Sequence, residues 1–352
     1  MKNVWWIAML LLIAVSGSVT AQNMPSKDQL PPGQWNQISP GGDTICGHGA
    51  PYSFYYREGS GQNLLIDFQG GGMCWNGQTC SPTADKTFDD SINPGDPSDN
   101  PALFPVGITD FGNPENPFIN DDMVFVDYCT GDFHTGNKDQ GYTYNNTYYD
   151  VKHNGYVNAA TVLNWVYANI PVPDSVFVTG CSAGSVGAAY WAADVKAHYP
   201  SKSVMLLGDS GGGWRGISGD TWNLWGSSYQ GATGANLNIP KFYTGAARAG
   251  VHVAEYNTAN DETQSFFHDV GFSGVVYADA LRANLRDITR GARNFRYYTE
   301  GGNLHCMIPR AEFYTYATNG IRLRDWVANV AAGTPVNNVV CTECAEPGYV
   351  GQ

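Results

Sequence analysis

One segment constrains the fold more than any other: a short apolar run that leads into a serine between small residues. Ser175–Thr179 (SVFVT) is followed by Gly180-Cys-Ser182-Ala-Gly184 and then by the alanine-rich stretch Ala188–Tyr199. The continuous apolar run predicts a buried strand and the alanine-rich stretch predicts a helix. A sharp turn between them lifts the serine oxygen above the sheet, where the helix N–H groups face it. Ser182 is therefore a candidate nucleophile.

The same alternation of strands and helices recurs along the chain. Helical spacing is found over residues 151–169, 277–290 and 310–331. Further buried strands are predicted at Leu64–Phe68, Met123–Tyr128, Ser203–Leu207, His252–Tyr256 and Phe295–Thr299. Apolar strands that alternate with helices indicate a parallel sheet covered on both faces, with its site at the carboxyl ends of the strands. We expect an α/β-hydrolase fold, with a mostly parallel central sheet flanked by helices.

The ends of the chain and two irregular stretches suggest its organisation. Lys2, an apolar run from Val4 to Val15 and small residues up to Ala21 predict a signal peptide at residues 1–21 and hence a secreted protein. No clean linker divides the rest, so we expect one catalytic domain over residues 22–352. Residues 22–62 suggest an irregular N-terminal lead. Residues 81–122, dense in Asp, Pro and Asn, suggest a surface insertion that borders the site.

Charge and aromatic content restrict the partners. The formal net charge is −13, and both nucleic acid and an anionic membrane repel an acidic surface, so we expect neither as a partner. Aromatic residues make up 13% of the chain. They suit a protein that stacks against sugars or apolar polymers, and they fit a tyrosine-rich core equally well.

The cysteines indicate disulfides. All 8 lie after the predicted signal peptide, and an even count in an exported protein favours disulfides over metal ligands. The Cys341-x-x-Cys344 pair has no second CxxC pair, so a small terminal bridge is a better interpretation than zinc. We expect no metal and no cofactor.

The acid and the base are sought downstream of the nucleophile, because α/β-hydrolases carry them in the order Ser, acid, His. His305 follows the predicted strand Phe295–Thr299, and Asp261 follows His252–Tyr256. We predict His305 as the base and Asp261 as the third member of the triad. Two alternatives stay open for the acid. Asp261 could simply cap a helix, and the adjacent Glu262 is a rival.

The other downstream histidines fit the role less well. His198 falls late in the helix that follows the nucleophile, on the wrong side of the sheet. His252 begins a strand, far from its carboxyl end. His268 falls in a possible helix behind Asp261.

A glycine-rich stretch follows the early strand Leu64–Phe68. Glycines at Gly70–Gly72 allow backbone N–H groups to face a tetrahedral oxyanion, together with the N–H of the residue after the nucleophile. The predicted oxyanion-hole donors are Gly71, Gly72 and Ala183.

A second serine competes with Ser182. Gly208–Gly213 (GDSGGG) matches the serine-site signature of chymotrypsin-like proteases, which need an upstream histidine and aspartate on an all-β double barrel. Neither His48 nor His134 lies in such a signature, and the neighbourhood alternates strand and helix. We interpret Asp209 and Ser210 as residues that shape the loop after their strand.

Cys181 and Cys306 are the neighbours of Ser182 and His305. Nucleophile and base must approach within hydrogen-bonding distance, and the neighbours of two touching residues often lie close enough for a disulfide. We therefore predict a Cys181–Cys306 bridge. The expected remaining pairs are Cys74 with Cys80, and Cys46 with Cys129.

Several motifs together resemble the pectin acetylesterase and Notum family of carboxylesterases. They are FQGGGMCWN (68–76), VDYCTGDFHTGN (126–137), VTGCSAGSVGA (178–188), NDETQ (260–264) and NLHC (303–306). The resemblance implies the same triad and oxyanion hole, and removal of acyl groups from hydroxyls. Met73 departs from it, because the family tends to have an aromatic residue there. The Cys-Ser and His-Cys pairs also resemble tannases and some feruloyl esterases, in which a disulfide joins the two catalytic loops.

These patterns together predict a secreted serine ester hydrolase. Its expected partner is an ester substrate, and the favoured reaction is deacetylation of an O-acetylated polysaccharide through an acyl-enzyme on Ser182. An esterase or depolymerase of aliphatic or aromatic polyesters would use the same triad. A catalytically silent carbohydrate-binding protein is the third alternative. The presence of the whole predicted set of catalytic residues argues against it.

Overall fold

The central feature of the computed structural model is one nine-stranded sheet with the order β1-β2-β4-β3-β7-β8-β11-β12-β15. The structure describes residues 24–83, 85–271, 275–346 and 348, so the predicted signal peptide lies outside the described residues. The strands are β1 (Trp35–Ile38), β2 (Phe54–Arg57), β3 (Leu64–Phe68), β4 (Asp122–Val126), β7 (Ser175–Cys181), β8 (Ser203–Asp209), β11 (His252–Thr258), β12 (Arg296–Glu300) and β15 (Val339–Val340).

The sheet is parallel from β4 to β15, and β2, next to the edge, runs antiparallel to both of its neighbours, β1 and β4. Buried, β-branched strands of this kind are typical of a sheet covered on both faces. The predicted α/β-hydrolase fold, with a mostly parallel sheet flanked by helices, is confirmed.

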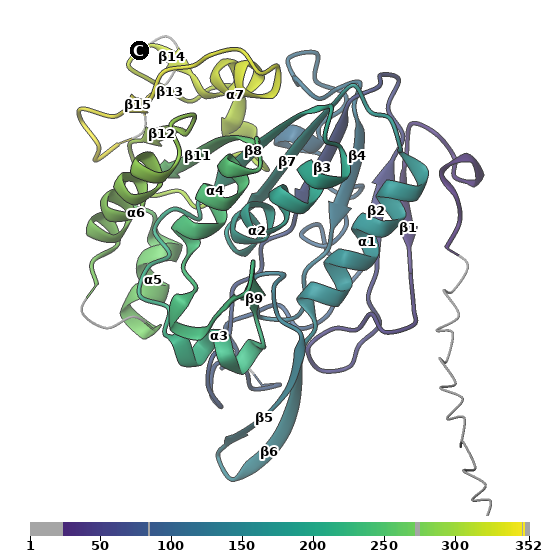
Figure 1. Ribbon diagram of the computed structural model, residues 1–352, viewed down its shortest axis with the longest axis vertical. Helices are drawn as coiled ribbons and strands as arrows, with labels where there is room; N and C mark the ends of the chain where they lie inside the picture. Colours follow the sequence, from purple (N-terminus) through teal and green to yellow (C-terminus); the bar gives the residue numbers. More distant parts are fainter. Residues whose placement is uncertain (1–23, 84, 272–274, 347, 349–352) are drawn as a thin grey trace, which may run out of the picture.

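The two faces of the sheet carry unequal layers (Figure 1). The larger core lies under the helices α1 (Gly155–Asn169), α2 (Ala183–His198), α4 (Ile239–Arg248) and α6 (Tyr277–Gly291). The smaller core lies under α7 (Leu323–Ala331) and two 3₁₀ turns, η2 (Gly107–Thr109) and η4 (Ala311–Tyr314). Two shorter helices, α3 (Gly219–Trp225) and α5 (Glu262–Gly271), follow β8 and β11.

Three small hairpins complete the fold. The longest projects beyond the sheet in Figure 1 and pairs β5 (Lys138–Tyr144) with β6 (Thr147–His153). The others pair β9 (Ser228–Tyr229) with β10 (Ala232–Thr233), and β13 (Ala317–Thr318) with β14 (Ile321–Arg322). The remaining 3₁₀ turns are η1 (Lys27–Gln29) and η3 (Gly234–Asn236).

Three predicted elements differ from the structure. The N-terminal lead contains β1 and β2, whose short runs gave no sign of a sheet edge. The helix expected from residue 151 begins at Gly155, because residues up to His153 pair in the β5–β6 hairpin. Only the second half of 310–331 is helical, because Asn319 and Gly320 adopt positive φ and turn the chain between β13 and β14.

The aromatic residues lie mainly in the core. Trp214, Trp222 and Trp225 are all at most 1% exposed, and many tyrosines are buried with them. This favours the tyrosine-rich core over a broad aromatic surface. Among the described residues, the helices are too short or too polar to cross a membrane.

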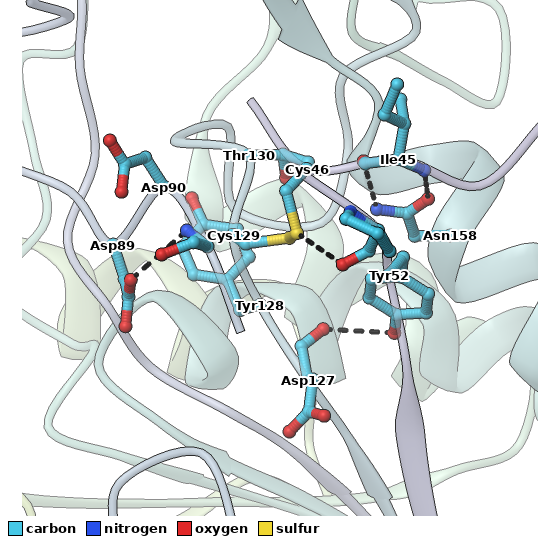
Figure 2. The surroundings of a disulfide bond; sticks show 12 residues. Ile45, Cys46, Tyr52, Asp89, Asp90, Asp127, Tyr128, Cys129, Thr130 and Asn158 are labelled. Carbon is cyan, nitrogen blue, oxygen red and sulfur yellow. Dashed lines mark hydrogen bonds between the residues drawn. A yellow bond between two sulfur atoms is a disulfide. The ribbon is translucent and has the colours of Figure 1, made fainter. Parts of the chain in front are cut away.

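The Cys46–Cys129 disulfide joins the N-terminal lead to the chain just after β4 (Figure 2). Two contacts support it. Tyr52 donates its hydroxyl to the Asp127 carbonyl at 3.0 Å, and the Asn158 side chain exchanges hydrogen bonds with the backbone of Ile45 at 3.0 and 2.9 Å. The lead is thereby fixed against both the sheet and α1.

Candidate active site

Ser182 occupies a sharp turn between β7 and α2. Its backbone angles are φ 57° and ψ −120°, outside the regions that a serine normally adopts. The strain is held by the surroundings: Ser182 N–H donates to the Asp209 carbonyl at 2.8 Å. A side chain on Gly184 would overlap the Phe68 carbonyl, and one on Gly180 would overlap the Gly184 carbonyl. The glycines of this motif are therefore required by close backbone approach.

The Gly70–Gly72 stretch lies against the nucleophile. A Cβ on Gly70 would come within 3.2 Å of the Ser182 Cβ. Gly71 and Gly72 have φ of 138° and 77°, which suit glycine alone. Their carbonyls accept hydrogen bonds from Asp89 N–H (2.8 Å) and the Tyr128 hydroxyl (3.2 Å). The N–H groups of Gly71, Gly72 and Ala183 have no acceptor among the described residues.

The acid and base candidates meet directly. His305 Nδ1 lies 2.7 Å from Asp261 Oδ2, although the residues are 44 positions apart. Asp261 is fully buried, and its carboxylate fixes the ring so that Nε2 is the other available nitrogen. Nε2 is buried and makes no hydrogen bond with the described residues. Contacts between nucleophile and base often tighten only in the complex with substrate.

Asp261 also caps α5, so the two interpretations of this residue are compatible. Its Oδ1 accepts from Gln264 N–H at 2.8 Å, as a helix cap does, while Oδ2 faces His305. The Gln264 side chain donates to Oδ2 as well, at 2.9 Å. Both carboxylate oxygens are thereby held in place. Glu262 instead accepts from Asn303 at 3.1 Å on the surface.

The loop that carries His305 is anchored by Asp209 and Ser210. The fully buried Asp209 carboxylate accepts from Met307 N–H at 2.6 Å and Ile308 N–H at 2.8 Å. Ser210 donates to Asp209 and accepts from Cys306 N–H, both at 2.9 Å. Sequence patterns assigned these two residues only to their own loop. Their role depends on the strand register, which sets Asp209 opposite Cys181, and no local sequence pattern signals it.

Burial raises the pKa of Asp209 to about 6, against the hydrogen bonds from the base loop and the neighbouring His305, which lower it. Asp67, at the end of β3, is also buried. Burial raises its pKa to about 8, and the negative charge of Asp209 adds to the effect. A pair of carboxyls whose charged forms are disfavoured thus lies beneath the two catalytic loops.

Disulfides join the cysteines as predicted. Cys181 and Cys306 are bridged, with 5.5 Å between their Cα atoms, so the nucleophile turn and the base loop are covalently joined. Cys74 pairs with Cys80, and Cys341 with Cys344. Two groups place cysteine near histidine: Cys74 and Cys80 with His153, and Cys181 and Cys306 with His305. In both, the sulfurs are oxidised to a disulfide, which removes the thiolates that a metal would need.

Two of the other three downstream histidines have structural contacts. His198 stacks on Tyr167 with 3.8 Å between ring centroids, and His268 Nε2 lies 2.7 Å from the Gly213 carbonyl. His252 is exposed at the start of β11.

The Phe267 ring lies beside the glycine stretch. A Cβ on Gly72 would come within 3.3 Å of the Phe267 ring, which also lies 6.3 Å from Trp75 and 5.1 Å from Trp214 (centroid distances). No sequence motif marks Phe267 or Trp214 as site residues, because their approach depends on how α5 packs against the loop after β8. The site thus has an apolar wall beside its predicted oxyanion hole.

The fold and this arrangement define an α/β-hydrolase. Residues 39–217, just over half of the chain, match the family described as Pectinacetylesterase. The chain therefore belongs to the pectinacetylesterase family, a family of ester hydrolases that act on acetylated polysaccharide, as the motifs suggested. The match includes Ser182 and the glycine stretch and ends before Asp261 and His305. A search of curated proteins returned no match.

Proposed function

We propose that this protein is a serine carboxylesterase that removes acetyl groups from an O-acetylated polysaccharide. The observation that carries the proposal is the 2.7 Å contact between His305 and Asp261, on a loop bridged to the turn of Ser182. Family membership supports the substrate class. A buried acid, a histidine oriented by it and a strained serine turn are the components of nucleophilic acyl transfer.

In the first half of the reaction, Ser182 Oγ attacks the acetyl carbonyl carbon and His305 Nε2 accepts the serine proton. The carbonyl oxygen becomes an oxyanion, which the N–H groups of Gly71, Gly72 and Ala183 stabilise. The C–O bond to the sugar then breaks, and His305 returns the proton to the sugar oxygen. The products are a free sugar hydroxyl and acetyl-Ser182.

In the second half, water replaces the sugar. His305 accepts a proton from the water as its oxygen attacks the acetyl carbon. The same three N–H groups stabilise the second oxyanion. Collapse breaks the bond to Ser182 Oγ, which regains the proton, and acetic acid leaves. Asp261 stabilises the positive charge on His305 in both halves.

The aromatic wall supports a small acyl group. Phe267 lies so close to Gly72 that a single methyl group there would touch its ring. Two other cavities, of about 800 and 570 Å³, are lined by other parts of the chain.

We further propose that the protein is secreted and acts as a single catalytic domain. The four disulfides support an oxidising destination. One sheet includes strands from Trp35 to Val340, and the predicted triad draws on three of its loops.

The test is a panel of esters with and without the nucleophile. Wild-type protein should release acetate from acetylated pectin or xylan, and should hydrolyse p-nitrophenyl acetate much faster than the palmitate ester. A fluorophosphonate should label wild-type protein at Ser182 and leave Ser182→Ala unlabelled. Preference for long-chain or aromatic polyesters would contradict the proposed substrate. Absence of labelling and of turnover in a folded wild-type protein would contradict the enzyme itself.

A further inference from the structure

A candidate second site lies next to Trp214, the residue that also contacts Phe267. A cavity of about 800 Å³ is bordered by α3, α4, α6 and the loop after β8. Its charged side chains are Arg215, Lys241, Arg248, Arg290 and Asp287, and we call it the basic cavity.

The charge of the basic cavity is opposite to that of the chain. The whole sequence has 32 acidic and 19 basic side chains, whereas the basic cavity has one acid and four bases. Cations gathered in a concave surface focus a positive potential and raise the local concentration of anions. In an otherwise acidic protein, such a cavity is the place where an anion would be attracted.

The single acid does not neutralise the basic cavity. Asp287 accepts from Arg215 at 2.8 Å and lies 3.9 Å from Arg290. Lys241 and Arg248 form no ion pair with the described residues. Lys241 Nζ donates to the Asn236 carbonyl, and Arg248 Nη2 donates to the Thr244 hydroxyl at 3.1 Å. Both side chains are exposed, so two positive charges remain for a ligand.

Helix stability explains one of these cations but not the other. Arg248 is in the last turn of α4, where a positive charge complements the helix dipole. Lys241 is in the first turn of the same helix, where a positive charge is unfavourable. Asn238 already caps that end by accepting from Lys241 N–H at 3.1 Å. The position of Lys241 therefore opposes the local electrostatics of the helix, as expected of a residue that serves a ligand.

One loop connects the basic cavity to the candidate active site. Trp214 lines the basic cavity and also contacts Phe267. The preceding Gly213 N–H donates to the Gln264 side chain at 2.9 Å, and Gln264 in turn donates to Asp261. The segment Gly213–Trp214 thus joins the lining of the basic cavity to Gln264, which contacts Asp261.

We propose that the basic cavity binds carboxylate groups of an acidic, uronate-bearing polysaccharide, an inference that rests on the proposed function for its ligand class. Each uronate unit of such a chain has one carboxylate, and guanidinium groups bind carboxylates through paired hydrogen bonds. The basic cavity holds the polymer by its acid groups while the catalytic residues act on its ester groups. A neutral polysaccharide lacks the group that this cavity recognises.

Direct binding tests this site without ester hydrolysis. The probe is a de-esterified oligogalacturonate, titrated calorimetrically at low salt into full-length Ser182→Ala. Dextran of similar length serves as the neutral arm and monomeric galacturonate as the small-acid arm. The site variant adds Lys241→Gln and Arg248→Gln. The matched control adds Arg286→Gln and Arg293→Gln instead, which removes the same charge from exposed positions outside the basic cavity. Thermal melting of every variant checks folding.

We expect the oligomer to bind and dextran not to bind. The site variant should bind about tenfold more weakly, the matched control by less than about twofold, and salt should weaken binding. Equal losses in both double variants would overturn the site in favour of general electrostatics. An unchanged site variant, or no binding by the folded parent protein, would also overturn it. Monomer binding as tight as oligomer binding would overturn the polymer as ligand. None of these outcomes depends on esterase activity, so the site and the proposed function can fail separately.

Discussion

The turn that carries Ser182 and the loop that carries His305 are held in place by different means. Ser182 joins a central strand to a helix, and its strained backbone is enforced by the neighbouring strands and by glycines that permit close approach. His305 lies in an irregular stretch between β12 and η4. That stretch is positioned by Asp261, by Asp209 with Ser210, and by the Cys181–Cys306 bridge.

The difference shows two ways of building a rigid site. A strand–turn–helix unit is rigid because its backbone hydrogen bonds belong to the fold itself. A loop needs contacts from elsewhere, and each of these can be removed singly. Changes at the nucleophile should therefore act on the chemistry, whereas changes around the base loop should act on position, flexibility and stability together.

The largest expected effect is at the reacting atoms. Ser182→Ala and His305→Ala should each lower turnover of p-nitrophenyl acetate by about 10³-fold or more, because nucleophile and base act as a unit. Ser210→Ala, a serine that only supports the base loop, is the matched control and should lose far less. Loss of activity in Ser210→Ala with activity intact in Ser182→Ala would mean that Ser210, and not Ser182, is the nucleophile.

The next effect concerns the acid. Asp261→Asn should lower kcat by about 10²-fold or more, yet less than Ser182→Ala, because the ring of His305 loses its orientation and its charge stabilisation. The helix cap should survive, since asparagine also caps helices well. A melting temperature close to that of wild type together with a large kcat loss would fit this role. A variant with wild-type kcat would exclude Asp261 from the triad.

Asp209→Asn tests the anchor of the base loop. The asparagine amide keeps one oxygen that can accept from the N–H groups of Met307 and Ile308. It loses the second carboxylate oxygen and the negative charge. We expect about a tenfold fall in kcat with little change in KM, and a loss of about 1–3 kcal/mol in the free energy of unfolding. Steady-state kinetics give kcat and KM, and urea melts give the free energy of unfolding. A variant with lower stability and unchanged kcat would leave Asp209 a purely structural role.

The disulfide should separate activity from folding. The double variant Cys181→Ser/Cys306→Ser frees the base loop, so kcat should fall by about tenfold at temperatures where the protein is still folded. Removing a link across 125 residues should also lower stability by up to about 4–5 kcal/mol in the chain-entropy account. Cys46→Ser/Cys129→Ser, whose bridge joins the N-terminal lead to the chain after β4, is the control. Parallel losses of activity and circular dichroism during melting would contradict a positioning role.

The smallest effect is on pH dependence. In the folded state, burial raises the pKa of Asp67 to about 8, well above the value of about 4 expected when unfolded. Between these two pKa values the folded protein binds one more proton than the unfolded chain. The stability that comes from this proton is fully present below about pH 4 and is lost as the pH rises through 8. Asp67→Asn should reduce the fall in melting temperature between pH 5 and pH 8 by about 2–4 °C. An unchanged or steeper fall in the melting temperature of the variant would mean that Asp67 does not cause this pH dependence of stability.

Sequence patterns predicted those parts of the molecule that local rules determine. The amphipathic stretch 277–290 forms α6, and the carboxyl-end rule for parallel sheets placed Asp261 and His305 in loops that do meet. The helical pattern over residues 310–331 predicted one continuous helix, which was wrong, because an Asn-Gly turn interrupts it.

The supports of the base loop lay outside the reach of local patterns. The part played by Asp209 depends on strand register, which sets it opposite Cys181, and on the return of a segment almost a hundred residues later. Phe267 and Trp214 likewise meet only through the packing of α5. Such long-range contacts leave no periodic signal in the chain.

The arrangement of the four disulfides has a consequence for how the chain is made. Cys74–Cys80 lies within the span of Cys46–Cys129, and the Cys181–Cys306 and Cys341–Cys344 bridges follow in turn, so no bridge crosses another. During synthesis from the N-terminus, each bridge can close before the first cysteine of the next separate span is needed. Cys181, however, cannot form its bridge until a further 125 residues have been synthesised. The nucleophile is thus translated well before the loop that activates it can be linked to it.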